Sequence, residues 1–179
     1  LTFTGANHEV PSESRFGSAV RVSSTTNILI ENCDFYFNSG GVYVSARTKN
    51  PTVRNCFFKG NDGLGYSEMA QLFFHLSCSN CLAENNIVQD GRTHGIRFYS
   101  GAQNVTARGN IIKNEDIGLY FKASKEPRFA EGNVILGCIH SNYNDRVGQP
   151  TKALNNTVEM PSYMEDPGES NLLFNPKFV

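Results

Sequence analysis

Apolar and polar positions recur along this chain with a period of about 23 residues. The repeat is easiest to follow from the second residue of each Asn-Asn, Asn-Cys or Gly-Asn pair, which we call the marker. The markers are Cys33, Cys56, Asn86, Asn110, Asn133 and Asn156. Successive markers lie 23, 30, 24, 23 and 23 residues apart, so the second step carries an insertion of about seven residues. A fixed period of this length predicts a repeat architecture.

Apolar residues keep fixed places relative to the markers. Three residues before the marker stand Ile30, Val53, Ala83, Ala107, Ala130 and Ala153, and two residues after it stand Phe35, Phe58, Val88, Ile112, Ile135 and Val158. Twelve and fourteen residues before it the chain places Val44, Phe74, Phe98 and Phe121, and Val42, Leu72, Ile96 and Leu119. The last two columns alternate with period two, as strands do, and follow Gly41, Gly95 and Gly118 at a bend. We expect all four columns to face one core.

A repeat of short strands cannot bury its apolar side alone, so its copies must stack on one another. The Leu-x-x-Leu-x-Leu pattern of leucine-rich repeats is missing, and a coil of short parallel strands remains. Each turn of such a coil lies roughly 4.8 Å above the last, so equivalent residues stack. The sequence therefore predicts a stack of Phe rings and a hydrogen-bonded ladder of Asn side chains at the marker.

A column of charged residues tests this alignment independently. Two residues before the marker the chain places Glu31, Arg54, Glu84, Arg108 and Glu131, which alternate in sign. Stacking in the predicted register brings opposite charges onto adjacent strands.

The stretch "NVTARGNIIKNEDIGLYF", which begins at Asn104, resembles the right-handed parallel β-helix repeats of the pectin-lyase-like superfamily. The resemblance covers about residues 17 to 160, and the closing "NLLFNPKFV" is similar to a "DPLFVD" phrase that often ends such domains. It implies an all-β, right-handed, single-stranded parallel β-helix of about six rungs. We expect the β-helix over residues 1–160, with an insertion loop at about 59–71, and an irregular C-terminal cap over 161–179.

This resemblance is specific for fold and leaves activity open. Proteins of this kind include polysaccharide lyases, uronate epimerases, glycoside hydrolases, phage tailspikes and non-catalytic surface proteins. A polysaccharide partner and a secreted, cell-surface or virion-surface location are therefore expected.

Charge and composition narrow the partners further. With 16 basic and 17 acidic residues the formal net charge is -1, so no overall field attracts nucleic acid or an anionic membrane. No apolar run approaches the roughly 20 residues of a membrane span. Five cysteines are too few for a disulfide scaffold of this size.

The candidate chemistry lies on the outward positions of one predicted sheet. Thirteen and eleven residues before the marker the chain places Tyr43, Phe73, Arg97 and Tyr120, and Ser45, His75, Tyr99 and Lys122. Aromatic rings suit sugar faces, whereas Arg and Lys suit carboxylate or sulfate groups. The insertion loop could place Asp62, Tyr66 and Glu68 over the same face. We therefore predict a binding groove there, and the alternative is a row of ordinary solvent-exposed strand residues.

Ordinary glycosidases need two carboxylates roughly 5 to 9.5 Å apart, and the outward columns contain none. Loop residues, chosen from Asp62, Glu68, Asp90 and Asp116, would have to supply both. β-Elimination on a uronic-acid polymer instead needs a cation, a base and an acid, and an epimerase needs a similar set with a different proton donor. The catalytic hypothesis assigns Arg97 as the cation, Lys122 or His75 as the base, and Tyr99 or Tyr120 as the acid. The substrate-binding hypothesis assigns Tyr43, Phe73, Asp62, Tyr66, Glu68 and His94.

The cysteines indicate no metal centre. Cys78 and Cys81 have zinc-like spacing, but no second Cys or His pair accompanies them, and two buried thiols are the simpler interpretation. Cys33 and Cys56 stand on adjacent rungs, where a disulfide is geometrically feasible and free thiols are the default. We expect no cofactor, although calcium could bridge a uronate to loop carboxylates such as Asp62 and Glu68.

Two hypotheses of function remain. The first is a carbohydrate-active β-helix that acts on an acidic polysaccharide by lyase or epimerase chemistry. The alternative is a non-catalytic glycan-binding or structural module of a larger surface or phage-tail protein.

Overall fold

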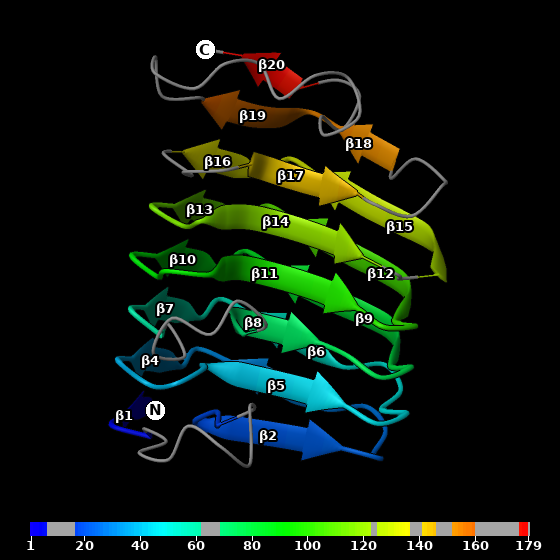
Figure 1. Cartoon of the computed structure of the whole chain (residues 1–179). Helices are drawn as coiled ribbons and strands as arrows, with labels where there is room; N and C mark the ends of the chain where they lie inside the picture. Colours follow the sequence, from blue (N-terminus) through cyan, green and yellow to red (C-terminus); the bar gives the residue numbers. More distant parts are fainter. Residues whose placement is uncertain are drawn as a thin grey trace.

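The computed structural model describes residues 1–6, 17–61, 69–122, 125–136, 141–145, 152–159 and 176–178. Every element within these residues is a β-strand, and the strands stack as successive coils (Figure 1). None of the described residues belongs to a helix with the length and hydropathy needed to cross a membrane.

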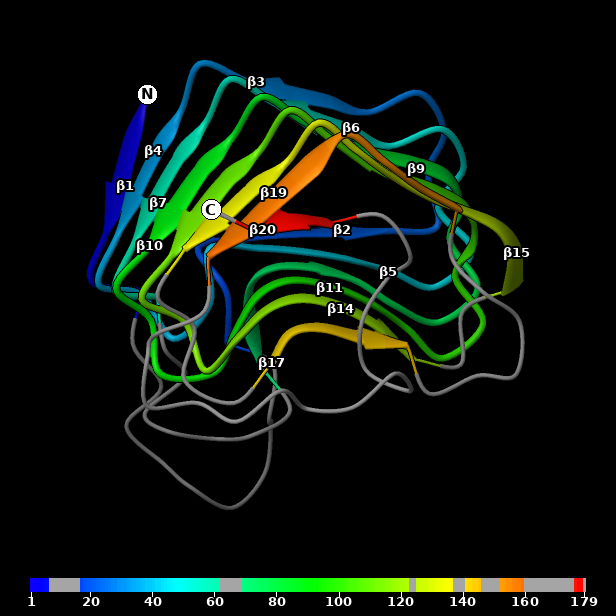
Figure 2. The same cartoon turned by 90° about the horizontal axis from the view of Figure 1, so that it is seen from above.

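The strands form three parallel sheets. Sheet A contains, in spatial order, β1 (Thr2–Thr4), β4 (Asp34–Tyr36), β7 (Phe57–Lys59), β10 (Ile87–Gln89), β13 (Ile111–Lys113), β16 (Val134–Leu136), β19 (Asn156–Glu159) and β20 (Pro176–Phe178). Sheet B contains β2 (Val20–Ser23), β5 (Val42–Ser45), β8 (Ala70–Phe74), β11 (His94–Tyr99), β14 (Ile117–Lys122) and β17 (Ser141–Asp145). Sheet C contains β3 (Leu29–Glu31), β6 (Thr52–Arg54), β9 (Ser79–Glu84), β12 (Gln103–Arg108), β15 (Lys125–Glu131) and β18 (Lys152–Leu154). Figure 2 shows the sheets as three walls around one interior. The predicted all-β parallel β-helix is confirmed.

The predicted apolar columns form the core. Phe74, Phe98 and Phe121 are fully buried, and their rings stack with centroids 5.0 and 5.1 Å apart. Phe35 and Phe58 make a second stack at 4.8 Å, which Phe3 extends. Identical registers on adjacent strands place these rings face to face, so the stacks follow directly from the repeat.

The marker asparagines form the predicted ladder. Each amide nitrogen donates to the side-chain oxygen of the next Asn, at 3.0 Å from Asn86 to Asn110, 2.9 Å from Asn110 to Asn133 and 2.8 Å from Asn133 to Asn156. Each also donates to a strand carbonyl, and each side-chain oxygen accepts a backbone N–H from the preceding rung. The buried amides are therefore satisfied within the stack.

Cys33 and Cys56 take the marker position in the first two rungs, and both are free thiols. The Cys56 thiol donates to backbone carbonyls in place of an amide, and burial raises its pKa to about 11. Small thiols thus continue the ladder column without a disulfide.

The residue before each marker has a left-handed backbone. Its φ lies between 52° and 62° at Asn32, Asn55, Asn85, Gly109, Gly132 and Asn155. Gly and Asn adopt this conformation at the least cost, which explains the Asn-Asn and Gly-Asn pairs of the repeat. At Gly109 a Cβ would lie 2.4 Å from the side-chain oxygen of Asn85, so that side chain would have to move.

The alternating charge column is confirmed on sheet C. Arg54 pairs with Glu31 at 2.7 Å, and Arg108 pairs with Glu84 at 2.6 Å. Each pair joins adjacent strands, as the register predicted.

Within the segment expected as an irregular cap, β20 adds a parallel strand to sheet A beside β19. The other residues of 160–179 lie outside the described part of the chain.

Candidate functional site

Sheet B places the predicted outward residues side by side. The register pairs Tyr43 with Phe73, Phe73 with Arg97, and Arg97 with Tyr120. Tyr43, Phe73, Ala70 and the packed ring of Tyr99 form a cluster separate from the main core. The outward direction of these side chains is therefore as predicted. We call Tyr43, Phe73, His75, Arg97, Tyr99 and Tyr120 together the sheet B face.

The solvent exposure of the sheet B face is lower than the interpretation as ordinary solvent-exposed strand residues assumed. Tyr43 and Phe73 are 1% exposed, Arg97 is 3% exposed and His75 is 8% exposed, while Tyr99 is half-buried. A strand pattern fixes which way a side chain points, but it does not fix what packs against it. The face is a packed aromatic layer.

A buried hydrogen bond joins Tyr43 to His75. The Tyr43 hydroxyl lies 2.8 Å from His75 Nδ1, and the imidazole stacks against Phe73 at 4.9 Å and Tyr99 at 5.2 Å. Burial raises the pKa of Tyr43, although the guanidinium of Arg21, 5.3 Å above its ring, opposes this. The phenol is therefore neutral at pH 7. Its oxygen can accept from Nδ1–H in the His75 tautomer whose unprotonated Nε2 can act as a base, or its hydroxyl can donate to Nδ1 in the other tautomer.

Arg97 lies among three aromatic rings. Its guanidinium carbon is 4.9 Å from the ring centroid of Phe73, 4.5 Å from that of Tyr99 and 5.2 Å from that of Tyr120. Cation–π attraction of this kind strengthens as water is excluded. The sheet B face thus contains the buried guanidinium of Arg97 packed against aromatic rings.

His94 joins the same face from the start of β11. Its ring stacks on Tyr120 at 4.7 Å, and its Nδ1 lies 3.1 Å from the carbonyl oxygen of Met69. The structure therefore brings seven predicted site residues together: Tyr43, Phe73, His75, His94, Arg97, Tyr99 and Tyr120.

Other predicted site residues are not placed by the structure. The backbone of Lys122 pairs with Tyr99, but its side chain lies outside the described part. Asp62, Tyr66 and Glu68 all lie outside the described residues. Their roles stay predictions.

The corner between sheets A and B holds a buried polar chain that the sequence interpretation missed. Five residues after the marker the column reads Asn38, Asn61, Gly91 and Glu115. Asn38 Nδ2 donates to Asn61 Oδ1 at 2.8 Å, in the manner of the marker ladder. The column then reaches Gly91, which has no side chain to continue it.

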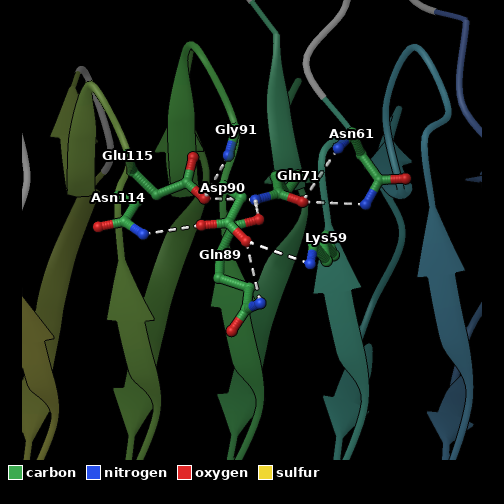
Figure 3. Close-up of polar contacts among 8 residues, drawn as sticks. All are labelled: Lys59, Asn61, Gln71, Gln89, Asp90, Gly91, Asn114 and Glu115. Carbon is green, nitrogen blue, oxygen red and sulfur yellow. Dashed lines mark hydrogen bonds and ion pairs between the residues drawn. The ribbon is translucent and has the colours of Figure 1, made fainter.

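Gln71 fills this gap from a neighbouring column, as Figure 3 shows. Its side-chain oxygen accepts from Asn61 Nδ2 at 2.9 Å, and its amide nitrogen donates to Glu115 Oε1, which also accepts from the Gly91 backbone at 3.1 Å. Gln71 itself stands where other rungs have the bend glycine, for example Gly41. Gly91 departs from one column and Gln71 departs from another, and the two departures compensate each other. Only a comparison of these two columns in the sequence could have revealed the hydrogen-bonded chain of side chains.

The pKa values of Glu115 and Asp90, which lie at this corner, are shifted in opposite directions. Burial raises the pKa of Glu115 to about 8, against the opposing effect of hydrogen bonds from Gly91 and Gln71. The side chain of Asn114, which donates to Asp90 Oδ1 at 2.7 Å, lowers the pKa of Asp90, and Lys59 adds to this. At neutral pH Glu115 is therefore protonated and Asp90 is ionised.

Among the described residues, no group of three or more His, Cys, Asp or Glu side chains is arranged to hold a metal ion.

Comparison with known proteins agrees with this architecture. No curated protein matches the chain. A family described as "Right handed beta helix region" matches residues 6–139, which is most of the chain. Together with the stacked parallel sheets, this match shows that the chain belongs to the right-handed β-helix family.

Proposed function

We propose that this β-helix acts on an acidic polysaccharide at the sheet B face, by lyase or epimerase chemistry. The observation that carries the proposal is the Tyr43–His75 hydrogen bond beside the buried cation Arg97. A proton-transfer group and a cation lie together on aromatic rings, which is the set of groups that abstraction of a proton next to a carboxylate requires.

Arg97 would neutralise the uronate carboxylate and so stabilise the charge that develops when the adjacent carbon loses its proton. His75, or Lys122 from the neighbouring strand, would take that proton. In elimination, Tyr99 or Tyr120 would protonate the departing glycosidic oxygen as the new carbon–carbon double bond forms. In epimerisation a different proton donor would return a proton to the opposite face of the sugar carbon.

The remaining expectations belong to the same proposal. Tyr43, Phe73 and His94 would line the site, and Asp62, Tyr66 and Glu68 would contact substrate from the insertion loop. Calcium, if used, would bridge the uronate to Asp62 and Glu68. The resemblance of the stretch from Asn104 to the pectin-lyase-like superfamily supports this assignment, as well as a secreted or surface location.

Product formation tests the proposal directly. The protein is incubated with alginate, pectate and glycosaminoglycans, with and without calcium, while absorbance of the unsaturated uronate is followed and NMR records epimer ratios. We expect product from at least one polymer and a loss of about 10²-fold or more in His75→Gln and Arg97→Ala. Arg108→Ala is the matched control, because it removes an exposed arginine of sheet C and should retain activity. Neither unsaturated product nor epimer from any polymer would contradict the catalytic proposal.

A non-catalytic glycan-binding or structural module is the second candidate, and the low exposure of the sheet B face favours it. Arg97 is held by three rings, and His75 is held by Tyr43 and two rings, so the face is packed as a stable layer. This candidate predicts saturable glycan binding without turnover. Tyr99→Ala should then weaken binding in calorimetry, because Tyr99 is the most exposed ring of the cluster.

A further inference from the structure

Cys78 ends the turn that joins β8 of sheet B to β9 of sheet C, three residues after His75, and Cys81 lies in β9. Both are buried in the main core, with exposures of 0% and 1%. The Cys81 thiol donates to Cys78 Sγ across only 3.1 Å. The two sulfur atoms therefore need to approach by about 1 Å to reach the 2.05 Å of a disulfide bond.

The backbone of this turn holds the two thiols in place. Leu76, Ser77 and Asn80 all have left-handed conformations, with φ of 48°, 60° and 54°. Such a concentration of unfavourable conformations in non-glycine residues persists only where neighbouring contacts determine it.

Those contacts come from the rungs on both sides. The Arg47 N–H donates to the Leu76 carbonyl at 3.0 Å, and the Ser77 N–H donates to the Ser100 carbonyl at 3.2 Å. The Asn80 amide donates to the Asn50 side chain at 2.7 Å and accepts from that of Asn104. A bond between the sulfur atoms therefore needs little rearrangement of the turn.

We propose that Cys78 and Cys81 are a disulfide-forming pair that joins the end of this turn to β9 when the chain folds under oxidising conditions. The oxidant is a low-molecular-weight disulfide such as oxidised glutathione. One cysteine thiolate attacks it, forms a mixed disulfide and releases one thiol. The second cysteine thiolate then attacks the mixed disulfide, forms the Cys78–Cys81 bond and releases the second thiol, so two cysteine thiols are oxidised and one small disulfide is reduced.

Burial determines when this reaction takes place. Desolvation and the adjacent Cys78 raise the pKa of the Cys81 thiol, so the thiolate is scarce in the folded protein. No oxidant reaches sulfur atoms with this exposure. The bond therefore forms while the turn is still open during folding, and the folded protein preserves whichever state it acquired.

This assignment goes beyond the interpretation of Cys78 and Cys81 as two buried thiols, and the zinc-like Cys-x-x-Cys spacing does not compete with it. A zinc site needs four ligands, and within the described residues no further His, Cys, Asp or Glu completes a set around these thiols. A disulfide needs only the two sulfur atoms already in contact.

Refolding of the unaltered protein tests the proposal without any substitution. The reduced, unfolded chain is refolded either in a glutathione redox buffer or with excess reductant, then denatured, alkylated and analysed by peptide mass spectrometry. After oxidative refolding we expect the peptide containing Cys78 and Cys81 to lose two hydrogen atoms and to carry no alkyl group. The oxidised form should also melt at a temperature about 2–4 °C higher than the reduced form.

Matched variants assign the bond. Cys33→Ala/Cys56→Ala should still lose the two hydrogen atoms, whereas Cys78→Ala should lose none in this peptide. Complete alkylation of both thiols in oxidatively refolded protein with a native circular dichroism spectrum would overturn the proposal. So would a bond that joins either cysteine to a different partner.

Discussion

At the residue scale, Gln71 and Gly91 show how one rung departs from the repeat without leaving a polar group unsatisfied. The Gln71 side chain supplies the amide that Gly91 lacks, and it joins Asn61 to Glu115. A Cβ at Gly91 would lie 2.5 Å from Glu115 Oε2 and 3.0 Å from Gln71 Nε2. The two side-chain positions are therefore in contact, and a substitution at one should change the effect on stability of a substitution at the other.

A double-mutant cycle measures this coupling. Gly91→Asn alone should be destabilising because of the clash, and Gln71→Gly alone should cost about 1–3 kcal/mol because buried amide and carboxyl groups lose their partners. The combined variant places an Asn in the ladder column and a Gly at the bend, as in the neighbouring rungs. We expect it to be more stable than the sum of the single changes by about 0.5–3 kcal/mol in urea unfolding. Simple additivity would show that the two exceptions do not compensate.

Glu115 gives the protein a pH-dependent stability whose sign can be worked out. Its pKa is about 8 in the folded protein and 4.5 ordinarily, so between these values the folded state binds the proton and the unfolded state does not. The free energy of unfolding should therefore fall as pH rises from about 4.5 to 8, by at most about 1.4 kcal/mol per pH unit, and level off above 8.

The variant Glu115→Gln isolates this effect. Gln cannot titrate, so the difference in unfolding free energy between wild type and variant should change with pH across that window. Asp90 does not interfere, because its lowered pKa affects stability only below its ordinary value of 3.8. A difference that stays constant from pH 4.5 to 8 would refute the assignment of a protonated Glu115.

At the element scale, the described residues include a second long Asn ladder whose surroundings differ from those of the marker ladder. The marker ladder is buried, whereas Asn27, Asn50, Asn80 and Asn104 form an exposed ladder with amide bonds of 2.7 to 2.8 Å. Hydrogen-bond lengths are similar in the two ladders. A comparison of the two ladders therefore isolates the contribution of burial to the free energy of unfolding.

Asn110→Ala and Asn80→Gly make that comparison. The first leaves buried groups of Asn86 and Asn133 without partners, so we expect a loss of about 2–4 kcal/mol in unfolding free energy. The second removes amides that water can replace, and Gly tolerates the φ of 54° at this position, so the loss should stay within about 1 kcal/mol. Equal losses in chemical denaturation would show that burial is not what makes the marker ladder stabilising.

The sequence predicts these elements well because the repeat is local and its copies superpose. The alternation of Leu72 and Phe74 fixes an inward face, and a step of 23 or 24 residues between markers, apart from one insertion, fixes the register. The burial of Tyr43, Phe73 and Arg97 could not be predicted, since it depends on packing over the outer face, which no period encodes. The Gln71 link was missed because it joins two columns that a single alignment keeps apart.

At the scale of the whole molecule, each coil contacts chiefly the coils above and below it. Strands in the middle of the stack, such as β8 and β11 in sheet B, have hydrogen-bonded neighbours on both sides. The end strands β2 and β3 pair on one side only within the described part of the chain. Stability in such a stack is close to a sum of coil and interface contributions, so it should be lowest at the ends.

Native-state hydrogen exchange tests this gradient. Amides of β8, β9, β11 and β12 should exchange by the global unfolding reaction, whereas those of β2 and β3 should exchange through local opening with a lower free energy. Phe98→Ala, which removes the central ring of a buried stack at a cost of about 3–5 kcal/mol, should lower protection in the coils on both sides of it. Arg108→Ala, which removes an exposed ion pair, should leave the gradient unchanged. Equal protection in the end and central strands would mean that the coils unfold as one unit, and the nearest-neighbour description would then fail.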